Sequence, residues 1–412
     1  MGGGEKHVGA IAEVLARRGP LDFLTHQPVD LAEMERRLGL SLAGARVLVV
    51  PDTPGFGEIA RLSANYDLFI NASHLDYFAP LGRRNALVVY FPATSVEQAQ
   101  ALSAYNRFKR IVRLSVMRVA GERGRLLLRQ AIFGSGGRSS DQTLVGRLAL
   151  GAAQAVANRR HQSGIFDGYQ LIFANSEFTR SWIQRYWAKD SFVLYPAVDV
   201  ERLRPGNKRN WILSVGRFFA GSHNKKHLEL IRAFQDAKRG ALASWEYHLA
   251  GGFSATESNE AYLKAVKKAA AEDSSIHLHI NCRLSELEEL YAQSKLFWHA
   301  AGYGEDEDLH PERFEHFGIT TVEAMAAGCV PVVLGKGGQP EIVNSGVNGI
   351  LWTIPNELIT ASAELAADEA RRDKLAQAAM VRAQDFGAAA FQARLAKALE
   401  ILGGDRAVDS DR

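Results

Sequence analysis

The feature that most constrains this chain is an alternation of short apolar runs with amphipathic stretches, which becomes regular from Trp211 onward. Each apolar run has the length of a buried strand, and the stretches between the runs carry apolar residues at helical spacing. Strands that alternate with helices in this way form a parallel sheet with crossover helices. The pattern therefore predicts a doubly wound α/β domain in the second half of the chain.

Both halves of the chain show this alternation of predicted strands and helices, and it is less regular in the first half. In the second half the predicted strands are 211–215, 245–250, 276–280, 295–300, 330–334 and 349–352, with the clearest helices at 225–238 and 285–293. In the first half the predicted strands are 45–51, 67–71, 86–91, 171–175 and 192–195. Because ligands of open α/β sheets bind at the carboxyl ends of the strands, we expect the site in a cleft between the two halves.

Two segments bear on the domain limits. A turn-forming group at 204–207 separates the two strand series and predicts a boundary there. The chain opens with a glycine-rich turn at 2–4 that leads into a helical pattern over 8–17, but no strand precedes the turn. Since strand, turn and helix normally come as a set, either the true start lies upstream or the first domain folds without its first strand.

Composition narrows the class of protein. The chain has 412 residues, of which 47% are hydrophobic and 23% charged, as in an ordinary globular enzyme and unlike a disordered or collagen-like chain. Two cysteines, Cys282 and Cys329, are too few for a disulfide framework and predict reduced thiols and no zinc site. No apolar run is long enough to span a membrane and no signal peptide is visible, so we expect a cytoplasmic protein.

The strongest local signal surrounds Gly318. Glycine permits close backbone approach, and a helix starting near Thr320 offers free N–H groups and the positive end of its dipole, which together favour an anion. Glu315 and Glu323 could accept hydrogen bonds from sugar hydroxyls. Thr320 and Glu323 also have the spacing of a capping box, and taken alone that alternative is the favoured one for Glu323.

A second signal lies at the start of the C-terminal sheet. Arg217 follows the first strand of that half, and Lys225 stands at the beginning of the next helix. Both cations would lie at the mouth of the sheet, where they could bind one pair of phosphates. Two solvated surface cations are the alternative, but the anion site at the same sheet edge favours phosphate binding.

These motifs together resemble one family. Gly216-Arg217 with Lys225, the two glutamates separated by seven residues, and the segments 2–5, 175–178, 195–199, 324–328 and 337–343 are similar to the family 4 retaining glycosyltransferases. The resemblance extends to mannosyltransferases of lipid-linked oligosaccharide assembly. It implies the GT-B fold, in which two doubly wound Rossmann-like domains face each other across a cleft. Residues 1–205 would form the acceptor-side domain, residues 206–385 the donor domain, and 386–412 a helix returning to the first domain.

The resemblance also implies roles for residues. Glu315, Arg217 and Lys225 would be catalytic, and His74 would lie on the acceptor side. The donor would further contact Gly3, Gly4, Gly216, Cys282, Arg283, Phe317, Gly318, Ile319, Thr320 and Glu323. No nucleophile with an adjacent base is apparent, so charge stabilisation of a departing nucleoside diphosphate, GDP or UDP, is the expected mechanism, with no metal or cofactor. Glu315→Ala should then abolish transfer with little change in melting temperature.

Some alternatives stay open. Residues 107–129 carry eight basic side chains and the single acid Glu122, a pattern that suits an anionic membrane surface, a phosphate-rich acceptor or a solvated helix face. A lipid-linked or free saccharide acceptor fits it. Nucleic acid is not expected, because few aromatic residues accompany the basic run. Rival functions are a GT-B epimerase or phosphorylase acting on a sugar phosphate, and a truncated, non-catalytic GT-B protein.

Overall fold

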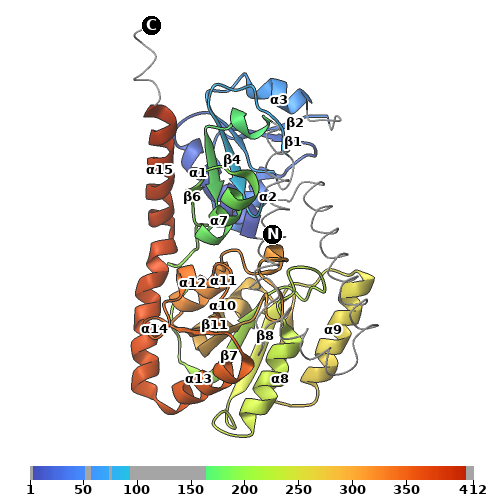
Figure 1. Ribbon diagram of the computed structural model, residues 1–412, viewed down its shortest axis with the longest axis vertical. Coiled ribbons are helices and arrows are strands. Elements are labelled where there is room, and N and C mark those ends of the chain that lie inside the picture. Colours follow the sequence, from blue (N-terminus) through green and yellow to red (C-terminus); the bar gives the residue numbers. More distant parts are fainter. Residues whose placement is uncertain (1–2, 52–56, 74–76, 93–163, 405–412) are drawn as a thin grey trace, which may run out of the picture.

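The computed structural model describes residues 3–51, 57–73, 77–92 and 164–404. Two α/β halves are stacked along the long axis, and a pair of long C-terminal helices runs beside both of them (Figure 1). In the described residues no helix is both long enough and apolar enough to pass through a bilayer.

The C-terminal half contains the sheet that the apolar runs predict. Its six strands are all parallel and have the order β12–β11–β10–β7–β8–β9. They are β7 (Arg209–Val215), β8 (Glu246–Gly251), β9 (Ile276–Ile280), β10 (Ser294–His299), β11 (Val330–Leu334) and β12 (Ile350–Trp352). Each predicted strand of this half is confirmed to within two residues. The strand order reverses between β7 and β10, which is where a doubly wound sheet opens a crevice for a ligand.

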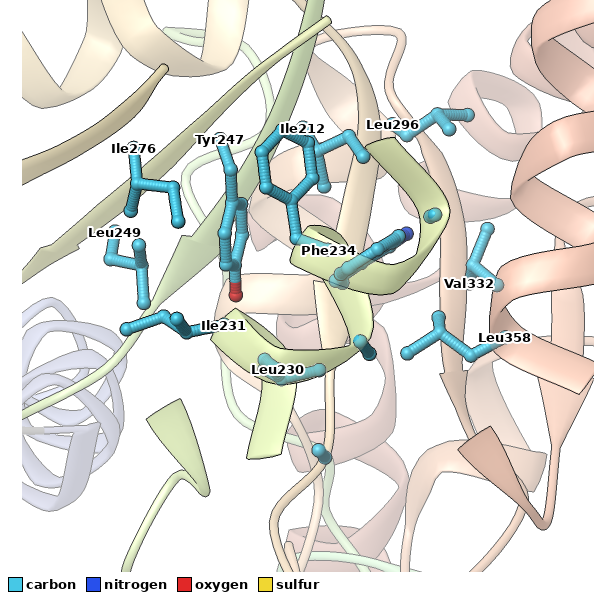
Figure 2. Packing of buried hydrophobic residues seen from close by; sticks show 14 of the residues in the cluster. Ile212, Leu230, Ile231, Phe234, Tyr247, Leu249, Ile276, Leu296, Val332 and Leu358 are labelled. Atoms are coloured by element: carbon cyan, nitrogen blue, oxygen red, sulfur yellow. The ribbon is translucent and has the colours of Figure 1, made fainter. Parts of the chain in front are cut away.

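Helices cover this sheet on both faces. They are α8 (His227–Lys238), α9 (Glu257–Ala270), α10 (Leu284–Gln293), α11 (Ile319–Ala326), α12 (Gln339–Ile342), α13 (Pro355–Ala367) and α14 (Glu369–Ala383), with short 3₁₀ turns at Pro311–Arg313 and Gln384–Phe386. Figure 2 shows the main core, in which Phe234 of α8 reaches Tyr247 of β8, with ring centroids 5.3 Å apart. Burying one such side chain contributes about 1.5–3 kcal/mol, so this layer fixes the sheet that carries the cleft.

The N-terminal half is built from two smaller parallel sheets. One has the order β3–β4–β5–β6 and the other pairs β1 with β2. The strands are β1 (Asp22–Thr25), β2 (Arg46–Val49), β3 (Phe69–Asn71), β4 (Asn85–Val89), β5 (Leu171–Ala174) and β6 (Phe192–Val193), and the helices are α1 (Gly3–Ala16), α2 (Leu31–Leu38), α3 (Gly57–Ser63) and α7 (Glu177–Trp187), with a 3₁₀ turn at Phe166–Gly168. Five of these strands were predicted, and β1 was missed.

A cavity of about 360 Å³ lies between the two sheets of this half. It is lined by Phe23 of β1, Phe69 of β3 and Ile11 of α1, among other apolar side chains. Within the described strands β1 pairs only with β2 and β3 only with β4, so each leaves one edge without a backbone partner. The expectation that this half lacks its first strand stays a prediction.

The C-terminal helix α15 (Ala388–Gly404) packs against the N-terminal half. Its buried residues Phe391 and Leu395 join a cluster with Ile11 of α1 and Val88 of β4. The chain thus passes between the halves twice, once near Val198 and once near Phe386. The two crossings are hydrogen-bonded to each other, because the Val198 amide donates to the carbonyl oxygen of Phe386 at 2.9 Å.

Candidate functional site

A cleft of about 1320 Å³ opens between the two halves. Helix α1 and the segment after β4, which includes Tyr90, line one wall. The loop after β7, the first turns of α10 and the segment leading into α11 line the other. The cleft therefore lies between the two halves, as the sequence predicts, and it is where the strand order of the C-terminal sheet reverses.

The structure brings most of the predicted site residues to this cleft. Those that line it are Gly3, Gly4, Gly216, Arg217, Lys225, Glu315, Phe317, Gly318, Ile319, Thr320 and Glu323. Cys282 and Arg283 are not among the lining residues, although Leu284 beside them is. His74 and the basic segment 107–129 lie outside the described residues.

Glu315 is the electrostatic centre of the cleft floor. One of its carboxylate oxygens, Oε2, is 2.5 Å from Lys225 Nζ and 3.0 Å from His299 Nε2. Its side chain is 19% exposed. Burial alone would raise the pKa of Glu315, but the Lys225 ammonium and the His299 hydrogen bond hold it well below its ordinary value. Glu315 is therefore a carboxylate at neutral pH that orients Lys225.

Local backbone geometry explains why Lys225 reaches this point. A Cβ added to Gly216 would lie 2.5 Å from Lys225 Cγ, so only glycine lets the lysine stem cross the end of β7. The next residue, Lys226, has a left-handed φ of 58° at the start of α8, where the Asn224 side chain accepts a hydrogen bond from its amide at 2.7 Å. Arg217 lies beside this group, with its guanidinium carbon 5.6 Å from the centroid of Phe219.

Helix α11 opens onto the cleft through its amino end. Its N-cap is Gly318, whose φ of 119° lies in the region that favours glycine, and no side chain in the described part of the chain caps the helix there. The carboxylate of Glu323 instead accepts hydrogen bonds from Tyr291 Oη at 2.9 Å and Lys6 Nζ at 3.3 Å. The capping-box interpretation of Thr320 and Glu323 is therefore wrong, because the helix starts earlier and Glu323 lies beyond its first turn.

The two opening glycines lie at a close approach of the halves. A Cβ on Gly3 would be 2.8 Å from the Ile319 side chain across the cleft. Tyr90 Oη donates to the Gly4 carbonyl at 2.9 Å, which anchors the first turn of α1 to the end of β4. Together with the Lys6–Glu323 ion pair, these contacts hold α1 against the amino end of α11.

Sequence reasoning missed a second link between the halves. The carboxylate of Glu341 accepts hydrogen bonds from the backbone amides of Glu177 at 2.7 Å and Phe178 at 2.6 Å. A side chain of the C-terminal half thus caps α7 of the N-terminal half. Burial raises the pKa of Glu341. The segment 337–343 was part of the family motif, but nothing local indicates that its glutamate reaches the other half.

Two histidines next to Glu315 were also missed, and of these only His316 lines the cleft. His316 stacks on Phe91 across the cleft, with ring centroids 4.4 Å apart, and burial lowers its pKa to about 3. His299 ends an apolar run that reads only as a strand. Its position could have identified His299 as a site residue, because it is the last residue of a strand whose carboxyl end faces the crevice.

Comparisons with known proteins agree with this geometry. Residues 198–382, somewhat less than half of the chain, match the family model described as Glycosyl transferases group 1. A curated relative, the GDP-Man:Man(3)GlcNAc(2)-PP-Dol alpha-1,2-mannosyltransferase of Dictyostelium discoideum, is 24% identical over 188 residues, which cover 42% of this chain and 35% of that protein. The match thus spans about a third of the relative's length.

Solved structures match the chain over nearly its whole length. Anabaena HepE in complex with UDP-glucose aligns with a TM-score of 0.62 at 17% identity, covering 97% of this chain and 96% of that one. A glycosyltransferase from Rickettsia africae gives 0.61 at 14% identity, with 96% and 94% covered. Sucrose-phosphate synthase from Thermosynechococcus elongatus gives 0.59 at 16% identity, with 96% and 92% covered. The chain therefore has the GT-B glycosyltransferase fold, and its residues 198–382 are similar to the glycosyl transferases group 1.

Proposed function

We propose that this protein is a family 4 retaining glycosyltransferase, which moves a hexose from a nucleoside diphosphate sugar to a hydroxyl of a saccharide or lipid-linked saccharide. The observation that carries the proposal is the meeting of Arg217, Lys225 and the amino end of α11 in one cleft. Two cations and a helix N-terminus suit a diphosphate better than any neutral ligand.

The proposed reaction follows from where charge develops. When the bond between the sugar and the diphosphate breaks, negative charge grows on the oxygen of the departing diphosphate. Arg217, Lys225 and the free amides at 318–320 would stabilise that charge. The acceptor hydroxyl would attack from the same face, so that the anomeric configuration is retained and the departing phosphate takes the proton. Glu315 would contact the donor sugar while holding Lys225 in place. No metal or cofactor enters this scheme.

The nucleoside would lie toward α10. Glu323 would bind the ribose hydroxyls, which requires it to exchange its bond from Lys6 for bonds from the sugar. The base would lie near 281–283, at the cleft's end beyond Leu284. The names of the relatives, one acting on GDP-mannose and one solved with UDP-glucose, make GDP- and UDP-linked hexoses the first donors to test.

The acceptor side of the proposal rests on the first half. His74 and the basic segment 107–129 would face a saccharide that carries phosphate or a lipid anchor, and the segment would bring the enzyme to the cytoplasmic surface of an anionic membrane. Failure to sediment with anionic vesicles at low salt would contradict the membrane part alone.

The test is a screen of nucleotide sugars that measures release of nucleoside diphosphate with and without acceptor saccharides. Release that depends on the acceptor is expected. Arg217→Ala should lower the rate about 10²–10³-fold, as does loss of one charge-stabilising donor in other enzymes. Lys264→Ala, on an exposed face of α9, is the control and should leave the rate unchanged. Epimerised donor without acceptor would refute transfer, and calorimetry showing no binding of GDP or UDP would favour a non-catalytic protein.

A further inference from the structure

A cluster of histidines lies at the outer edge of the C-terminal sheet, away from the cleft. His248 on β8 pairs directly with His277 on β9, and His279 follows two residues later on the same face. Glu246 of β8 and Glu286 of α10 complete the group. None of these five side chains lines the cleft.

Three ligand atoms converge at one end of the cluster. Glu246 Oε2 is 3.1 Å from His277 Nε2 and 3.5 Å from His248 Nε2, and all three atoms lie within 4.8 Å of one another. Ligands bound to one tetrahedral zinc ion at about 2.0–2.1 Å stand about 3.3 Å apart. The cluster therefore needs only a small inward movement of His277 to hold such an ion.

A hydrogen-bond chain fixes which nitrogen of His248 carries its proton. Glu286 can only accept, so the 2.8 Å contact from His279 Nδ1 places a proton on that nitrogen. In the tautomer of His279 that carries its proton on Nδ1, the other ring nitrogen, Nε2, accepts from His248 Nδ1 at 3.0 Å. His248 Nε2 is left with a bare lone pair, and it is the atom that faces Glu246.

This arrangement is incomplete without a cation. The His248 side chain is 6% exposed, and its Nε2 has no hydrogen-bond partner among the residues that the structure describes. A lone pair and a carboxylate oxygen that face each other at 3.5 Å repel unless a positive charge lies between them.

We propose that Glu246, His248 and His277 form a binding site for one divalent transition-metal ion of the zinc class, with water as the fourth ligand. Imidazole nitrogen with one carboxylate is a donor set that suits zinc. The chain through His279 to Glu286 is the outer support that metal-bound histidines usually have. Because His277 is 41% and Glu246 45% exposed, the ion can enter from solvent. The expectation of no metal was based on the small number of cysteines and on the chemistry of the cleft. The site proposed here instead consists of two histidines and a glutamate at the edge of the sheet.

The ion would fasten the edge strand β9 to β8. Among the described strands β9 has a neighbour on one side only, so side-chain links matter more for it than for the central strands. Trp211 packs against His248 with ring centroids 4.1 Å apart and ring planes tilted by 39°, which places a fluorescent reporter beside the ion.

The test is calorimetric titration of the chelator-treated full chain with Zn²⁺, followed by titration with Co²⁺. We expect one equivalent of Zn²⁺ to bind, a higher melting temperature with Zn²⁺ present, and visible Co²⁺ absorption of tetrahedral intensity. His277→Gln and Glu246→Gln should each weaken binding at least tenfold, and Glu286→Gln about 10–100-fold. The first two positions are partly exposed, so these variants are expected to fold.

Two controls make the result specific. His310→Gln removes an exposed histidine outside the cluster and should leave Zn²⁺ affinity unchanged. The Trp211→Phe variant should still bind Zn²⁺. Its tryptophan fluorescence should decrease less on addition of Co²⁺ than that of the native chain, because the ring beside the ion is gone. Binding of no Zn²⁺, or equal affinity in His277→Gln and the native chain, would overturn the proposal. Neither outcome bears on sugar transfer, which is measured separately.

Discussion

Replacement of Glu315 by alanine tests whether this carboxylate supports the fold as well as the proposed chemistry. The change would remove the carboxylate that accepts from both the Lys225 ammonium and His299 Nε2. The Lys225 side chain is 22% exposed and the His299 side chain 3% exposed. Removing one partner of a buried ion pair costs about 3–5 kcal/mol, and the partial exposure of Lys225 favours the lower end. We therefore expect a loss of about 3 kcal/mol, in contrast to the small change anticipated from the sequence.

For a domain of 150–250 residues, 1 kcal/mol lowers the melting temperature by about 2–4 °C, so Glu315→Ala should melt about 6–12 °C earlier in calorimetry. Glu272→Ala removes an exposed carboxylate of the same half and should shift it by less than about 1 °C. Glu315→Gln keeps an acceptor oxygen and should fall between the two. A melting temperature of Glu315→Ala within about 2 °C of the native value would refute the reasoning.

The same ion pair predicts a pH dependence. The pKa of Glu315 is depressed in the folded chain, so the unfolded chain binds this proton more readily. Its contribution to stability is present above the ordinary glutamate pKa of about 4.3 and is lost as the pH falls below that value. The gap in melting temperature between native protein and Glu315→Ala should therefore shrink between pH 6 and pH 3. A constant gap would contradict the assignment.

The remaining predictions concern close contacts and the link between the halves. Gly251→Ala should destabilise the C-terminal half strongly or prevent folding, because its Cβ would lie 1.9 Å from the Gly216 carbonyl oxygen, whereas Gly252→Ala, with its nearest atom at 3.8 Å, should melt like the native protein. Thermal unfolding of both purified variants decides this, and equal stability would contradict it. Glu341→Ala should speed amide exchange in the first turn of α7 about fivefold, since loss of a helix cap costs about 1 kcal/mol; unchanged exchange there would show that the cap is redundant.

The strands were predictable because burial on both faces gives a parallel strand a continuous apolar run, as in 330–334, where sequence and structure agree at both ends. Strand β1 was missed because Asp22–Thr25 has only four residues, and charged and polar ones at its ends. Its place in the fold depends on pairing with β2, which no local pattern encodes.

The candidate site was predictable only in part, for a similar reason. Arg217 and Gly318 follow local rules, since a strand end and a helix start each mark the crevice edge. The contacts of Glu315 with His299 and Lys225 could not be predicted locally, because the three residues come from separate segments of the chain that only the sheet topology brings together. For Glu323 the local spacing was misleading. It matches a capping box, but the side chain instead accepts hydrogen bonds from residues of α1 and α10.

The hollow between β1 and β3 has a practical consequence. Within the described residues, β1 and β3 each have one edge without a neighbouring strand, beside a space lined with apolar side chains, and such an edge can pair with an extended chain. We expect purified samples to self-associate through this edge as concentration rises, and a short alternating apolar peptide to suppress that association. The first region to fray on heating should then be β1, α2 and β2, because no strand ladder of the described residues joins the β1–β2 pair to the sheet β3–β4–β5–β6.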